Sequence, residues 1–153
     1  MEVMSNLMDG FALALSFNNL LACFIGVLIG TIVGVLPGIG PVGAMALLLP
    51  FSYGLDAGTS LILLAGIYYG AMYGGSTTSI LINVPGEAAS VVTCLDGYQM
   101  ARKGRAGAAL AVAGIGSWVA GTVGVLLLML FAPPLGRAAL SFGPPEYFAI
   151  SLV

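Results

Sequence analysis

Histidine is absent from this chain of 153 residues, which removes the commonest general base, proton shuttle and metal ligand of proteins at once. Cysteine is nearly absent too. Cys23 and Cys94 both lie in apolar runs, where a free cysteine usually behaves as a small hydrophobic residue. We therefore expect no disulfide framework, no metal site, no cofactor and no catalytic residue. An intramembrane hydrolase is disfavoured because no serine can pair with a histidine.

Charged residues are also scarce. They make up 7% of the chain, against roughly 25% in an ordinary soluble domain, and only four are lysine or arginine. So few basic residues, with a net charge of -2, argue against a protein that binds nucleic acid. Hydrophobic residues make up 59% of the chain, and the mean hydropathy is +1.10. This composition predicts an all-α integral membrane protein that lies in the lipid bilayer.

The sequence divides into two parts. Residues 1–17 mix apolar side chains with Glu2, Asn6 and Asp9. Because no positive charge precedes the apolar run, we predict an N-terminal interfacial segment and not a cleaved signal peptide. Residues 18–153 predict a transmembrane domain. The apolar run that begins at Tyr147 is far shorter than the about 20 residues of a spanning helix, so we expect this domain to be incomplete, as a fragment of a longer protein.

Uncharged stretches predict helices over residues 18–36, 59–72 and 107–131, and Ala132-Pro133-Pro134 is expected to end the last of them. Glycines recur at every fourth position in and just after the first two helices. Small residues at that spacing let two helix backbones approach closely, so we interpret them as a helix-packing face and not as a direct part of transport. These glycines are Gly26, Gly30, Gly34 and Gly38, and Gly66, Gly70 and Gly74.

A first break is predicted at Pro37-Gly38-Ile39-Gly40-Pro41, where prolines and glycines end the helix. The apolar run that follows, residues 42–55, is too short to cross a membrane. A half-helix or re-entrant segment fits this length, and its N-terminus would present free N–H groups and a partial positive charge to an anion. A plain turn between two helices at the membrane surface is the alternative.

Two further breaks are predicted, at residues 74–79 and at Pro85-Gly86-Glu87. In the first, Gly74-Gly75 precedes four consecutive hydroxyl residues, and an unwound segment of this kind can bind a carboxylate through N–H and O–H groups and a cation through C=O groups. The alternative is that these hydroxyls bond back to their own helix. Glu87 has two interpretations, a charge at a helix N-terminus, which is the commoner role, or a ligand inside the membrane.

Three of the four basic residues, Arg102, Lys103 and Arg105, cluster in one predicted loop. By the positive-inside rule this loop faces the cytoplasm. An anion-binding role for the cluster is the alternative. Because a re-entrant segment would reverse the parity of the spans, the sequence leaves the topology open.

The order of these breaks resembles a known family. The segments GVLPGIGP (34–41), YGGSTTSILINVPGEAASVVTCLDG (73–97) and YQMARKGRAGAAL (98–110) closely resemble the N-terminal part of the large membrane subunit (TctA family) of bacterial tripartite tricarboxylate transporters. The resemblance implies a multi-pass protein of the bacterial inner membrane that imports citrate or related organic acids as a secondary transporter. It also implies two partners, a small membrane subunit and a periplasmic substrate-binding protein. This chain would then be half, or less, of an inverted-repeat transporter.

The resemblance carries the motif positions over to this chain, and we hypothesise that they bind the substrate and the coupling cation, sodium or a proton. A passive channel and a structural or assembly subunit are the alternative functions. The predicted substrate-binding residues are Pro37, Gly38, Gly40, Pro41, Ser76, Thr77, Thr78, Asn83, Pro85 and Gly86, and the predicted cation-binding residues are Gly74, Gly75, Ser76 and Ser79.

Overall fold

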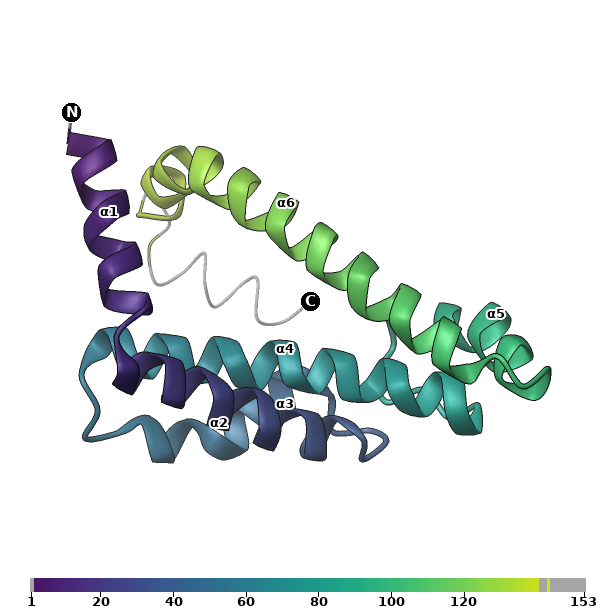
Figure 1. Cartoon of the computed structure of the whole chain (residues 1–153). Helices are drawn as coiled ribbons and strands as arrows, with labels where there is room; N and C mark the ends of the chain where they lie inside the picture. The colour runs from purple at the N-terminus through teal and green to yellow at the C-terminus, as the bar shows by residue number, and fades with distance from the viewer. Residues whose placement is uncertain (1, 141–142, 144–153) are drawn as a thin grey trace. The chain divides into compact units, whose positions relative to one another are not determined.

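The computed structural model describes residues 2–140 and Gly143, and within them the chain is helical without a strand (Figure 1). This confirms the predicted all-α class. Two stretches are long and apolar enough to cross a membrane, residues 17–34 and residues 106–131. The chain forms two compact units, Met1–Gly114 and Ile115–Val153. The elements are α1 (Glu2–Ala14), α2 (Phe17–Gly34), α3 (Gly40–Leu48), η1 (Leu49–Ser52), α4 (Ala57–Ile82), α5 (Val91–Arg102) and α6 (Ala106–Leu140). The apolar run predicted from Tyr147 lies outside the described residues.

Helices α2 and α4 run side by side, and glycines from both helices form the contact (Figure 1). A methyl group added at Gly26 would lie 2.5 Å from the carbonyl oxygen of Leu63, and one added at Gly66 would lie 2.8 Å from that of Cys23. The two backbones therefore touch directly, which confirms the predicted packing role of these residues. For Gly38 the prediction is wrong, because Gly38 lies beyond the end of α2 and a methyl group added there would meet nothing within 4 Å. The reciprocal set is Gly26, Gly30 and Gly34 on α2 and Gly66, Gly70 and Gly74 on α4.

Helix α3 packs against α4 as well, and its Ala44 is fully buried. Ala44 joins Leu63, Ile67 and Ala71 of α4 in a small apolar core. The short helix and the 3-10 turn after it end at Ser52, as the length of the apolar run predicted. Whether this segment re-enters the membrane stays a prediction.

The predicted break at residues 74–79 is wrong, because α4 continues as a helix to Ile82. The hydroxyls bond back to carbonyls of their own helix. Thr77 Oγ1 donates to Tyr73 O at 2.9 Å, and Ser79 Oγ donates to Gly75 O at 2.9 Å. The hydroxyls thus find acceptors without any unwinding, which is the alternative considered for these residues.

The other two breaks are confirmed. Helix α2 ends at Gly34 and α3 begins at Gly40, while α4 ends at Ile82 and α5 begins at Val91. In the first connection Gly38 and Gly40 have φ angles of 92° and 65°, which glycine adopts without steric cost. In the second, Asn83 ends α4 in the left-handed conformation with φ of 59°, a position that asparagine tolerates better than most residues.

The predicted helix end at Ala132-Pro133-Pro134 is also wrong, since α6 continues to Leu140. Proline lacks a backbone N–H and removes one i to i−4 hydrogen bond from a helix, but its φ angle is itself helical. The residues on both sides of the prolines keep a helical conformation. The two prolines therefore cost the helix backbone hydrogen bonds but do not end it.

A buried polar group joins α1, α2 and α4 at the start of α4. Asn19 is 2% exposed, and its Nδ2 donates to the carbonyl oxygen of Leu13 at 2.8 Å. The hydroxyl of Thr59 lies 2.5 Å from Asn19 Oδ1 and 2.7 Å from Asp56 Oδ1, so its single proton serves one of these acceptors at a time. Bonds from the Thr59 hydroxyl and N–H hold the pKa of Asp56, the N-cap of α4, below its usual range.

Thr59→Val is therefore expected to destabilise the fold, because it leaves the buried Asn19 oxygen without a donor at a cost of about 1–3 kcal/mol. Unfolding by denaturant in detergent micelles measures this change, and Thr59→Ser, which keeps the hydroxyl, is the control. Equal stability of the two variants would contradict this role for Thr59.

The cap at Asp56 makes part of the folding stability depend on pH. Because folding lowers the pKa of Asp56, its contribution to folding stability is complete above the unfolded-state pKa and is lost as the pH falls through the lowered value.

Candidate functional site

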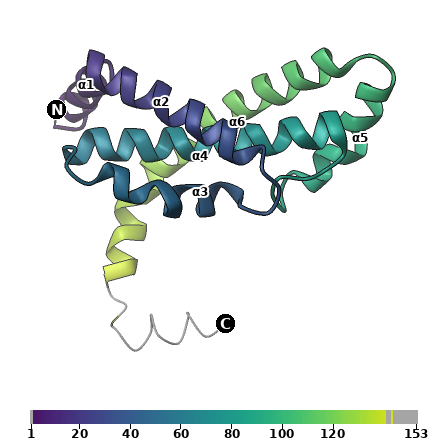
Figure 2. The same cartoon turned by 90° about the horizontal axis from the view of Figure 1, so that it is seen from below.

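The two confirmed breaks meet in space although some 50 residues of sequence separate them (Figure 2). Gly38 N in the α2–α3 connection donates to Gly86 O in the α4–α5 connection at 3.4 Å. Gly86 is buried against two helices, since a methyl group added there would lie 2.5 Å from Gly75 Cα on α4 and 2.8 Å from Gly34 O at the end of α2. Because Gly86 has no side chain, the two connections can touch.

A cavity of about 400 Å³ lies where these connections meet. Its wall combines the start of α3, the Pro-Gly-Glu segment and the first residue of α5. The lining residues are Gly38, Gly40, Pro85, Gly86, Glu87, Ala88 and Val91. Four predicted substrate-binding residues, Gly38, Gly40, Pro85 and Gly86, are therefore brought together in one cavity.

The start of α3 gives this wall its electrostatic character. The first N–H groups of a helix have no acceptor within the helix, and the helix dipole places a partial positive charge there. Gly40 begins α3 beside the cavity, and Pro41, one residue later, occupies a position where its missing N–H costs nothing. No lysine or arginine lines the cavity among the described residues. Such a wall can bind an anion through backbone N–H groups.

The other predicted site residues lie elsewhere. Pro37 is exposed in the connection, Pro41 is buried in α3, and Asn83 is exposed at the end of α4. The remaining residues are parts of α4. Their carbonyls belong to a continuous helix, so the unwound carbonyls on which the cation hypothesis depended do not occur there. These helical residues are Gly74, Gly75, Ser76, Thr77, Thr78 and Ser79.

Glu87 lines the cavity, although the sequence favoured a helix-terminal role for it. Helix α5 begins only at Val91, and its first turn contains no acidic residue. Ser90 orders this approach to the helix: its hydroxyl donates to Glu87 O at 2.9 Å and accepts from Glu87 N at 3.2 Å. Partial burial raises the pKa of the Glu87 carboxyl above its usual range. Its place directly after Pro-Gly was the sequence signal for a position in a break.

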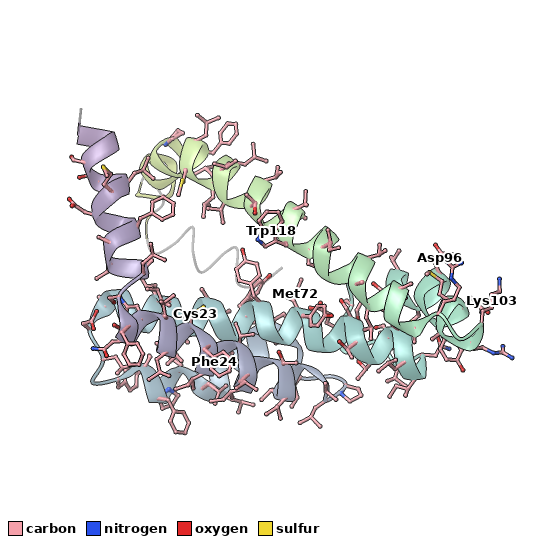
Figure 3. The ribbon with its side chains drawn as sticks, in the orientation of Figure 1. Cys23, Phe24, Met72, Asp96, Lys103 and Trp118 are labelled. Atoms are coloured by element: carbon pink, nitrogen blue, oxygen red, sulfur yellow. The ribbon has the colours of Figure 1, made fainter. Side chains whose placement is uncertain are left out.

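A second, smaller cavity of about 270 Å³ lies beside α5. Its wall is mostly apolar, with Thr93 and Asp96 as its polar members. The basic residues Arg102, Lys103 and Arg105 are exposed at the turn after α5, and Figure 3 shows Lys103 and Asp96 at this end of the unit. None of the three basic residues lines either cavity. The predicted cytoplasmic position of this cluster stays a prediction, and anion binding by the cluster stays the alternative.

The sequence is similar to a family of transport proteins and to a bacterial relative. A family model described as "Tripartite tricarboxylate transporter TctA family" matches residues 20–153. A relative from Agrobacterium vitis, named "Uncharacterized 52.8 kDa protein in TAR-I ttuC' 3'region", is 62% identical over 150 residues. The match covers 98% of this chain but 30% of the relative, so the chain spans less than a third of that protein. No solved structure matches the chain.

Proposed function

Because the chain belongs to the TctA family of tripartite tricarboxylate transporters, we propose that it forms part of the membrane subunit of a secondary transporter. The transporter imports tricarboxylates or related organic acids across the bacterial inner membrane, driven by a cation gradient. A periplasmic binding protein delivers the substrate, and a small membrane subunit completes the complex. The chain itself performs no enzymatic reaction.

The observation that carries this proposal is the single cavity formed by two separate breaks. A helix interrupted inside a membrane protein exposes backbone N–H groups, and such groups bind anionic substrates in transporters built from broken helices. The lining glycines, Gly38, Gly40 and Gly86, let a carboxylate approach the backbone closely. Binding through N–H groups without a basic side chain keeps the anion exchangeable.

In transporters of this architecture, substrate sites lie at the interface between repeated halves. We propose that the cavity is one side of such an interface, and that a related segment of the longer protein supplies the other side. The full-length protein is therefore the object on which binding and transport are to be measured.

Protection from chemical labelling tests the proposal. In the full-length protein with Cys23 and Cys94 replaced by alanine, citrate is expected to slow maleimide labelling of Ala88→Cys several-fold, because the anion occupies the cavity that Ala88 lines. Lys103→Cys, at the exposed turn after α5, is the matched control and keeps its labelling rate. Protection of neither cysteine, or equal protection of both, would count against a carboxylate site in this cavity.

A further inference from the structure

We propose that Glu87 is the proton-carrying group of this cavity: it takes up a proton when an organic anion binds and returns it to water when the anion leaves. The coupling ion of the transporter is then the proton. This inference rests on the proposed function, because it takes the cavity to be the place where the carboxylate binds.

Glu87 stands alone as a titratable group in the described wall of the cavity. The α2–α3 connection contributes Gly38 and the start of α3 contributes Gly40. Helix α4 contributes Gly75 behind Gly86, and α5 contributes Val91. Asp96, the next acidic residue along the chain, lines the other cavity. No described residue forms an ion pair or a side-chain hydrogen bond with the Glu87 carboxylate, so its charge is not neutralised by a neighbour.

Repulsion between like charges couples the binding of the anion to the protonation of Glu87. When a carboxylate substrate enters this cavity beside an ionised Glu87, at least two negative charges share a space of about 400 Å³, and each raises the free energy of the other. A proton on Glu87 removes this repulsion. It also turns one carboxyl oxygen into a donor, which can bond to the substrate carboxylate. One proton from water joins one glutamate oxygen, and the net charge of the occupied cavity stays at that of the substrate.

Partial burial of Glu87 also favours the protonated carboxyl, since burial disfavours the ionised form before any anion binds. A sodium ion next to an ionised Glu87 would also relieve the repulsion. Glu87 carries the side-chain oxygen atoms of the described lining, so sodium would take its other ligands from backbone carbonyls of the two connections. The binding test is therefore made without sodium.

The test is citrate binding to the full-length protein in sodium-free buffer, measured at several pH values for the wild type and for Glu87→Gln. The wild-type Kd divided by the Kd of Glu87→Gln is expected to rise about tenfold per pH unit above the pKa of Glu87, because one proton is linked to binding. Taking this ratio cancels the ionisation of citrate itself. Glu87→Asp, which keeps a carboxyl, is expected to keep the pH dependence.

The outcomes separate the two proposals. A ratio that does not change with pH, while citrate still protects Ala88→Cys, would overturn the role of Glu87 and leave the site in place. Absence of citrate protection at Ala88→Cys while Glu87 is intact would overturn the site itself. Should Glu87→Gln fail to fold, a pH indicator in weakly buffered solution at about pH 8 reports the wild type: uptake of close to one proton per citrate supports the proposal, and no uptake refutes it.

Discussion

Gly30→Ala is expected to lose about 1–3 kcal/mol of folding stability or more, because its methyl group would overlap the backbone of α4. The added carbon would contact the carbonyl oxygen of Ile67 and lie 2.8 Å from Ile67 Cα. If the neighbouring atoms of α4 belonged to a side chain, that side chain could adopt another rotamer. They belong to the helical backbone, which can move away only if α2 and α4 separate. The abundance of folded protein in the membrane and its unfolding in detergent both measure this loss.

Gly10→Ala is the matched control for this substitution. Gly10 lies inside α1, and a methyl group there meets nothing within 4 Å. Alanine is a better helix former than glycine by about 1 kcal/mol, so the control is expected to be neutral or slightly stabilising. Similar losses in both variants would show that the effect comes from the loss of glycine in general and not from the contact between α2 and α4.

Gly86→Ala is expected to reduce carboxylate uptake at least tenfold in cells that express the complete transporter. Its methyl group would lie 2.5 Å from Gly75 Cα and 2.8 Å from Gly34 O, both of which are backbone atoms. The α4–α5 connection must therefore shift outward, and the bond from Gly38 N to Gly86 O, which holds the two sides of the cavity together, breaks. Uptake of labelled citrate at equal protein abundance measures the effect.

Ala89→Val serves as the control in the same connection. Ala89 is exposed and does not line the cavity, so two added methyl groups are expected to leave uptake within about twofold of the wild type. Wild-type uptake by Gly86→Ala at normal abundance would mean that the meeting of the two connections does not shape the site.

The sequence predicted the helix contact well because the contact consists of missing side chains. Glycine at every fourth position can be recognised directly in the sequence, and a helix face without side chains favours close approach of another helix. The spacing did not say which helices pair. That Gly30 faces Ile67 depends on the path of the chain through α3, which brings α4 back along α2.

The hydroxyl run misled the sequence analysis for a physical reason. Serine and threonine can satisfy a carbonyl four residues earlier in the same helix or a ligand outside it, and both uses require the same residue types. At Thr77 and Ser79 the structure shows the first use. Gly74 and Gly75, which suggested unwinding, are instead places where the Gly34 end of α2 and Gly86 press against α4.

The meeting of the two proline-glycine breaks could not be derived from the sequence by local rules. Each break is predicted by the conformational limits of proline and glycine alone. Their proximity is a tertiary result, fixed where the end of α2 packs against α4 and Gly86 fits against both helices. Glu87 gains its place in the cavity by the same route, because its neighbour Gly86 anchors the connection.

Direct contact between the backbones of α2 and α4 also limits how this unit can change shape. Two helices that touch through main-chain atoms have no rotamers to rearrange between them, so they turn or tilt as a single rigid rod. At the cavity, the segments that can change conformation are the non-helical residues 35–39 and 83–90. In the proposed transport cycle, which alternates between the two sides of the membrane, the protein would thus pivot on the same short segments that line the cavity.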